Sequence, residues 1–124
     1  MSNLLVWFEI PAIDINRGAK FYSTVFDYPP MQQMDFGGFK MAFFPSDGTG
    51  LNGGALCQGT GYKPSEDGAL IYLAASPDLN VALSKVETAG GKVITPKKII
   101  TEKYGYMAIF IDSEGNRIAL HSEK

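Results

Sequence analysis

Few side chains in this sequence could carry out acid-base or metal chemistry, and two of them lie in short alternating stretches near opposite ends of the chain. His121, the single histidine, follows DSEGNRIAL, and Glu9 lies within LLVWFEI at residues 4–10. An imidazole exchanges protons near neutral pH, and a buried carboxylate can act as a base or accept hydrogen bonds from a cationic group. Glu9 and His121 are therefore the candidate catalytic residues. A surface carboxylate on the rim of a sheet and a solvated side chain near the end of the sequence are the alternatives.

Other residues of reactive type are predicted to be structural. Cys57 follows the apolar stretch GGAL without a basic neighbour in sequence, which is typical of a small buried hydrophobe. Tyr62 and Lys63 lie in the turn-rich stretch 59–68 and are expected to be exposed.

GTGLNG, residues 48–53, matches the dinucleotide pattern GxGxxG, but a strand-like GGALCQ follows where a helix would have to begin. Without that helix N-terminus, the sequence predicts no nucleotide site.

The first half of the chain predicts the element that positions Glu9. Residues 4–10 alternate as a strand, with an apolar even face and with Trp7 and Glu9 on the odd face. Asp14 is a plausible N-cap for a helix in which apolar residues recur at helical spacing up to residue 26. A hairpin around residues 37–38 and the strand GGALCQ complete the order βαβββ.

The second half repeats that order and positions His121. Residues 69–75 read as a strand, Asp78 as the cap of a helix that ends at Gly90 and Gly91, and three further strands follow, with Pro96 marking a bulge or an edge. We therefore predict one α+β domain over residues 1–124. Its two βαβββ modules, about 1–60 and about 68–124, are joined by a linker at about 59–68.

Composition excludes several classes of function. With 124 residues, of which 45% are hydrophobic and 19% charged, the chain is predicted to form one compact domain. A net charge of -2 and scattered basic residues argue against a nucleic-acid partner, and no apolar run approaches the roughly 20 residues of a membrane span. A single cysteine and an N-terminal stretch without secretory features predict a cytoplasmic protein.

Four stretches taken together resemble a known superfamily along essentially the whole chain: VWFEIPAIDINRGAKFY, GGALCQGTGYKPSEDG, AGGKV and YGYMAIFIDSEGNRIALHS. They are similar to the vicinal-oxygen-chelate superfamily, the group of glyoxalases, bleomycin-resistance proteins and extradiol dioxygenases. The resemblance implies two βαβββ modules that form a curved mixed sheet around a cavity, commonly completed in a homodimer. It also implies, as the alternative to an exposed turn, that the linker with Tyr62 and Lys63 covers the cavity or a dimer seam. Because many functions share this fold, the resemblance does not assign a reaction.

The resemblance also implies where enzymes of this group would hold a divalent metal. Their ligands are a histidine seven residues before the aspartate that opens the first helix, a histidine in the first strand of the second module, and a glutamate after the Gly-Asn of the last hairpin. These positions fall on Trp7, on Leu70 or Ile71, and on Ala119. An indole N–H and alkyl groups offer no lone pair to a metal. We therefore predict a member that holds neither a metal nor another cofactor.

Strand alternation indicates which side chains would line the cavity. The predicted binding residues lie on the strand faces away from the helices: Trp7, Glu9, Met107, Ile109, Ala119 and His121. We predict a homodimer that binds a small amphipathic, aromatic or cationic molecule there. One alternative is a lyase or isomerase in which Glu9 is the base and His121 its partner or electrophile. The other is a non-catalytic interaction or structural module in which Trp7 fills the cavity.

Overall fold

The computed structural model describes residues 4–46 and 53–124, which form two four-stranded sheets with the same strand order. In the first sheet, β1 (Trp7–Pro11) pairs in parallel with β4 (Gly53–Gln58), and β3 (Lys40–Phe43) and β2 (Gln32–Asp35) follow. In the second, β5 (Ile71–Ala74) pairs in parallel with β8 (Arg117–Ser122), and β7 (Gly105–Ile111) and β6 (Lys92–Thr101) follow. This repeated order confirms the predicted pair of βαβββ modules. The glycine-rich stretch 48–53 lies outside the described residues except for Gly53, which begins strand β4.

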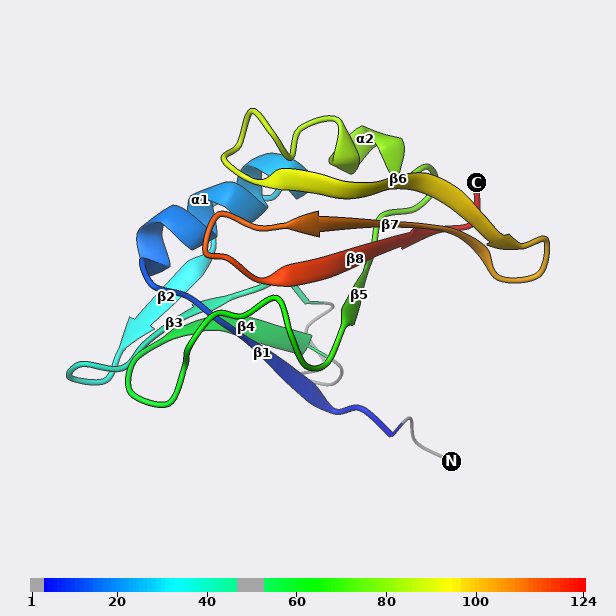
Figure 1. Cartoon of the computed structure of the whole chain (residues 1–124). Helices are drawn as coiled ribbons and strands as arrows, with labels where there is room; N and C mark the ends of the chain where they lie inside the picture. The colour runs from blue at the N-terminus through cyan, green and yellow to red at the C-terminus, as the bar shows by residue number, and fades with distance from the viewer. Residues whose placement is uncertain (1–3, 47–52) are drawn as a thin grey trace.

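The two modules share one hydrophobic core on the side covered by the helices. Helix α1 (Ile15–Phe26) begins at Asp14, whose carboxylate accepts hydrogen bonds from the backbone N–H groups of Asn16 and Arg17 at 3.1 Å, as predicted for an N-cap. From α1, Phe21 packs on Phe110 of the second sheet, with ring centroids 5.8 Å apart. Figure 1 shows α1 and α2 (Asn80–Leu83) on the same side of β6, β7 and β8.

The helix of the second module is shorter than predicted. It occupies only Asn80–Leu83, and Leu79, not Asp78, is its N-cap residue, although the Asp78 carboxylate accepts a hydrogen bond from the Asn80 N–H at 3.0 Å. After the helix, Val86 N–H bonds to the Leu83 carbonyl at 3.2 Å, three residues back. Such bonds tighten the chain into turns, so apolar spacing over 79–86 buries a face without a long α-helix.

The remaining local predictions concern strand β6 and the ends of the strands. The pairing of β6 with β7 shifts register between Thr95 and Lys98, so Pro96 marks the predicted irregularity. The first strand begins at Trp7, and residues 4–6 precede it with exposed side chains, so the predicted strand over 4–10 is too long at its start.

Among the described residues, no helix is long and apolar enough to cross a lipid bilayer.

A buried carboxylate from the second module holds the start of α1. Glu114 accepts hydrogen bonds from the backbone N–H groups of Ile13 at 2.9 Å and Asp14 at 2.7 Å, and from Arg17 Nε at 2.8 Å. Burial by itself would raise the pKa of Glu114. The hydrogen bonds from Arg17, Asp14 and Ser113 and the charge of Arg17 outweigh that effect and hold the pKa below its usual value. This contact fixes β1, which leads directly into α1, against the second module.

Candidate functional site

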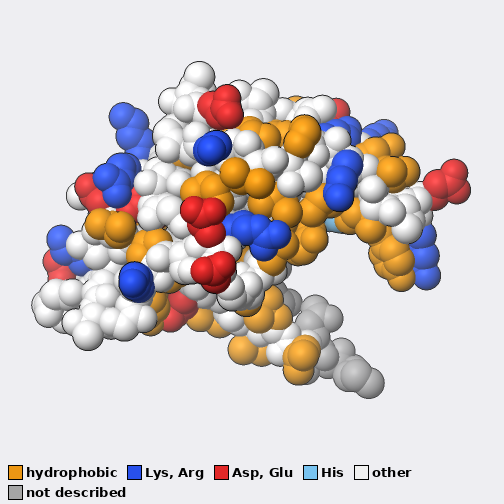
Figure 2. All heavy atoms as spheres, in the orientation of Figure 1, with side chains coloured by type: hydrophobic (Ala, Val, Ile, Leu, Met, Phe, Trp, Pro, Cys, Tyr) orange, Lys and Arg blue, Asp and Glu red, His pale blue; other side chains and the backbone are white. Residues whose placement is uncertain are grey.

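The faces of the two sheets that point away from the helices enclose a hollow. A hydrogen bond connects the two sheets at one end: Asn116 Nδ2, just before β8, donates to the carbonyl of Pro11, the last residue of β1, at 2.7 Å. From there β1 and β8 diverge (Figure 1). Figure 2 shows the surface hollowed between these strands, with hydrophobic side chains on both sides.

Glu9 lies on this face with two aromatic side chains as hydrogen-bond donors. The Tyr62 hydroxyl donates to Glu9 Oε1 at 2.5 Å, and Trp7 Nε1 donates to Oε2 at 3.3 Å. The hydrogen bond to the Glu9 carboxylate raises the pKa of Tyr62 to about 12, so the phenol remains a donor at neutral pH. The ring of Phe39 stacks on Tyr62 with centroids 5.3 Å apart. Glu9 is thus an exposed carboxylate held between an indole and a phenol.

Tyr62 is the member of this site that the sequence did not predict. It lies in the turn-rich linker and was expected to be exposed, whereas it is half-buried and contacts a residue 53 positions earlier. The local turn is visible in sequence as glycines, since Gly61 has φ +91° and the Tyr62 N–H bonds to the Gly59 carbonyl at 3.1 Å. A turn predicts a change of direction, but not which strand the turned side chain reaches.

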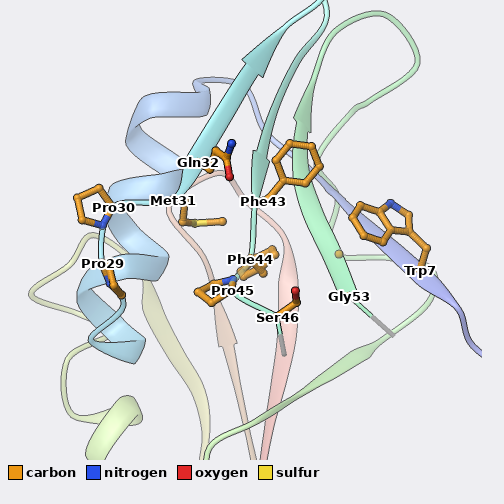
Figure 3. Close-up of a pocket in the computed structure, with 11 residues that line it drawn as sticks. Trp7, Pro29, Pro30, Met31, Gln32, Phe43, Phe44, Pro45, Ser46 and Gly53 are labelled. Atoms are coloured by element: carbon orange, nitrogen blue, oxygen red, sulfur yellow. The ribbon is translucent and has the colours of Figure 1, made fainter. Parts of the chain in front are cut away.

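Trp7 lines a cavity and does not fill it. The indole is 37% exposed and forms one wall of a cavity of about 430 Å³ at the end of β3 and β4. Figure 3 shows Trp7 and Phe43 next to each other, with Met31 and Phe44 further along the same cavity. No charged side chain of the described residues lines it. This volume lies within the range of small-molecule pockets, but apart from Trp7 none of the residues predicted to line a binding cavity borders it.

The apolar residues predicted to line the pocket form a compact cluster in the second sheet. Met107 and Ile109 are each 7% exposed, Ala119 is fully buried, and Leu70 packs against the three. Ile71 packs instead against the main core on the helix side. Leu70 is thus the one of the two aligned positions that lies on the Ala119 face. None of these four side chains lines the cavity next to Trp7.

His121 does not contact Glu9. Its Nε2 donates a hydrogen bond to the Tyr104 carbonyl at 2.6 Å, at the β6–β7 turn. The strand register places it beside Ala74 of β5 and Met107 of β7. His121 also lies four residues beyond Arg117, the first residue of β8, a strand rise of about 13 Å. The structure therefore does not bring the predicted base and its partner together, and catalysis through this pair stays a prediction without a supporting contact.

Cys57 lies on the same face of β4 as Ala55, and its thiol is buried. Burial first, and the nearby Glu9 carboxylate second, raise the pKa of the Cys57 thiol to about 12. A thiol with that pKa is almost entirely protonated at neutral pH and is a poor nucleophile. Its placement agrees with the interpretation of Cys57 as a small buried hydrophobe.

Comparison with known proteins identifies the family. The model of the Glyoxalase/Bleomycin resistance protein/Dioxygenase superfamily matches residues 4–120. The chain belongs to this superfamily. No curated protein matches the sequence.

Solved structures of the superfamily share the fold at low sequence identity. A glyoxalase/bleomycin resistance protein from Albidiferax ferrireducens has a TM-score of 0.70 at 18% identity, over 98% of this chain and 100% of that one. The fosfomycin resistance protein FosX from Listeria monocytogenes has a TM-score of 0.66 at 17% identity, over 100% and 93%. Glyoxalase I from Zea mays has a TM-score of 0.71 at 16% identity, over 94% of this chain but only 45% of the maize protein, so the chain spans less than half of that relative. At these identities the likeness shows the fold.

The side chains at the positions that the resemblance predicts for metal ligands do not fit a divalent metal. Trp7 donates its only polar hydrogen to Glu9, and Leu70 and Ala119 pack in an apolar cluster. In the part of the chain that the structure describes, no three His, Cys, Asp or Glu side chains come together in a metal-binding arrangement. Divalent metals require lone pairs from several such groups. The donor chemistry of this face therefore differs from that of a metal-holding member of the superfamily.

Proposed function

We propose that the protein is a metal-independent binding protein for a small amphipathic molecule with a cationic or hydrogen-bond-donating group. The observation that carries this proposal is the position of Glu9. Its carboxylate lies between Trp7 and Tyr62, and Trp7 is also a wall of the apolar cavity of about 430 Å³. A ligand could therefore place a positive group against Glu9 and an apolar or aromatic group along the indole.

The chemistry of the three side chains supports a cationic group. An indole and a phenol present electron-rich faces that attract cations, and a carboxylate adds a full negative charge. Two donors already orient the Glu9 carboxylate, and a carboxylate can accept about four hydrogen bonds, so acceptor sites remain for a ligand. Orientation before binding lowers the entropy that a ligand must lose on binding.

The proposal includes a homodimer and a cytoplasmic location. Several large apolar side chains near the hollow are exposed, including Leu5, Val6 and Tyr72 at 58%, 61% and 50%. A second copy that covers them would exclude water from the site and strengthen its electrostatic interactions. Sedimentation of the purified protein tests this part, because a monomer at micromolar concentration would contradict it.

The ligand class can be tested with a matched pair of small probes. Phenethylamine carries a cation on a phenyl ring, and 2-phenylethanol carries a neutral hydroxyl on the same scaffold. We expect the protein to bind the amine at least several-fold more tightly, by titration followed with NMR chemical shifts. Glu9→Gln should abolish that preference, whereas Glu102→Gln, at an exposed glutamate of the β6–β7 turn, should keep it. Equal affinities for the two probes in the wild-type protein would refute a cation site.

Metal independence is tested separately. The protein is purified without chelator, incubated with zinc, nickel or manganese, and desalted before metal analysis. We expect far less than one metal ion per chain and an amine affinity that EDTA does not change. Stoichiometric metal that survives desalting would overturn this part of the proposal, whatever the result with the two probes.

A further inference from the structure

A second cavity, of about 180 Å³, lies where β1, the linker 59–68 and β8 meet. Two acidic side chains, Glu9 and Asp67, and two basic side chains, Lys63 and Arg117, line it. Among the residues that the structure describes, no salt bridge joins any of these four. The cavity therefore presents both signs of charge without neutralising either of them internally.

Arg117 is the basic residue of most consequence here. It is the first residue of β8, and strand alternation places it on the same face as Ala119 and His121. The residue is half-buried, and its side chain has neither a hydrogen bond nor an ion pair with a described residue. A guanidinium is always charged and offers five donors in a planar fork that matches a carboxylate.

The side-chain amide of Asn116 connects the segments that form the walls of this cavity. Asn116 is only 5% exposed, and its Nδ2 donates to the Pro11 carbonyl at 2.7 Å and to Asp112 Oδ2 at 3.0 Å. Its Oδ1 accepts from the Ser65 N–H at 3.4 Å. One side chain thus connects β1, the linker and the β7–β8 hairpin. These hydrogen bonds fix the three segments relative to one another, and Glu9, Lys63 and Arg117 all line the cavity between them.

We propose that this cavity binds the charged end of a zwitterion. Arg117 and Lys63 contact its carboxylate, and Glu9 contacts its cationic group. The inference rests on the proposed function, because Glu9 serves both, and it narrows the ligand class to amphipathic molecules that carry both charges close together. The small volume admits a headgroup the size of an α-amino acid backbone, while the apolar part extends along Trp7. Asp67 adds a second negative charge and favours the cationic half of the same headgroup.

Four probes on one phenyl scaffold test this inference: phenylalanine, phenethylamine, 3-phenylpropionate and 2-phenylethanol. We expect phenylalanine to bind roughly tenfold more tightly than phenethylamine, since a fork of charge-assisted hydrogen bonds is added. Arg117→Gln should remove that tenfold difference without weakening the binding of phenethylamine, because it takes away a positive charge and leaves Glu9 in place. Lys92→Gln, at an exposed lysine at the start of β6, is the matched control and should change neither affinity.

The outcomes separate this inference from the proposed function. If phenethylamine binds in a Glu9-dependent manner but phenylalanine binds no better, the zwitterion site is wrong and the cation site stands. If phenylalanine and 3-phenylpropionate bind in an Arg117-dependent manner and Glu9→Gln has no effect, the cation site is wrong and only the anion contact remains. If Arg117→Gln weakens phenylalanine and phenethylamine by the same factor, or if phenylalanine does not bind at concentrations on the order of 10 mM, the zwitterion proposal is overturned.

Discussion

The carboxylate of Glu114 joins the second module to the start of α1, and the substitution Glu114→Gln tests how much this contact stabilises the fold. The Glu114 side chain is fully buried, whereas that of Arg17 is 52% exposed. Glutamine keeps the shape, and its carbonyl can still accept from the backbone N–H groups of Ile13 and Asp14. Its amide nitrogen, however, would face Arg17 Nε and the Ser113 hydroxyl, which now donate to Glu114 Oε2 at 2.8 and 2.9 Å.

The expected loss follows from the contacts that change. Leaving one partner of a buried ion pair alone costs about 3–5 kcal/mol, but half-exposed Arg17 can turn to water, which reduces the cost. We therefore expect a fall of about 2–3 kcal/mol in the free energy of unfolding at neutral pH. For 124 residues, an unfolding entropy of roughly 2.1 cal/mol/K per residue converts this into a Tm about 10 °C lower.

The pH dependence gives the sharper measurement. The pKa of Glu114 is lower in the folded protein than in the unfolded chain, so its stabilising effect is complete above the unfolded pKa of about 4.3. That effect is lost as the pH falls through the folded pKa. The difference between wild type and Glu114→Gln in urea unfolding should therefore be full at pH 7 and should shrink below about pH 4.

The control is Glu102→Gln, because Glu102 is exposed and neither of the salt bridges between described residues involves it. It should change the free energy of unfolding by less than about 0.5 kcal/mol at every pH. A difference between wild type and Glu114→Gln that stays constant down to pH 3 would refute the reasoning, because it would show that glutamine disturbs the packing rather than the charge.

Three further substitutions or measurements follow from the same structure. Tyr22→Phe removes the buried hydroxyl that donates to Asp112 Oδ2 at 2.6 Å, and it should lower the urea unfolding free energy by about 1.5–3 kcal/mol, whereas Tyr104→Phe, at an exposed ring, should have little effect. Asp14→Ala removes the N-cap of α1 and should cost about 1 kcal/mol in the same assay; no measurable loss would show that Glu114 alone holds that end of the helix. The pKa of the Cys57 thiol is about 12, so at pH 8 it should react with a disulfide reagent only at the rate of unfolding, and fast labelling of the native protein would contradict its burial.

The sequence predicted those parts of the fold that depend on local spacing. Alternation in β1 correctly separated Ile10, 1% exposed in the core, from Trp7 and Glu9 on the opposite face. The cap at Asp14 was also local, because its acceptor and donors lie within three residues. The length of the second helix was predicted wrongly, because apolar spacing continues to Val86 whereas the helix ends at Leu83 and tight turns follow.

Contacts between distant segments could not be predicted in the same way. Nothing in the spacing of GTGYKPSEDG indicates that Tyr62 reaches Glu9, because that contact depends on how the linker crosses the seam between the modules. The aligned position that fell on Leu70 or Ile71 was ambiguous in sequence for a related reason. Only the packing of Leu70 on Met107, Ile109 and Ala119 shows which of the two faces away from the helices.

The helix side of the sheets carries the buried contacts that stabilise the fold, and the other side carries the proposed binding residues. Effects on stability and on ligand binding can therefore be measured separately. Stability comes from the helix side, where Asp112 accepts a hydrogen bond from Tyr22, and Glu114 accepts from the start of α1, across the two modules. Glu9 and Arg117 are exposed or half-buried on the other face, so neutral isosteres there leave no buried charge unpaired. A loss of ligand affinity in Glu9→Gln or Arg117→Gln with an unchanged Tm would therefore report on binding itself, because the unchanged Tm would show that the fold is intact.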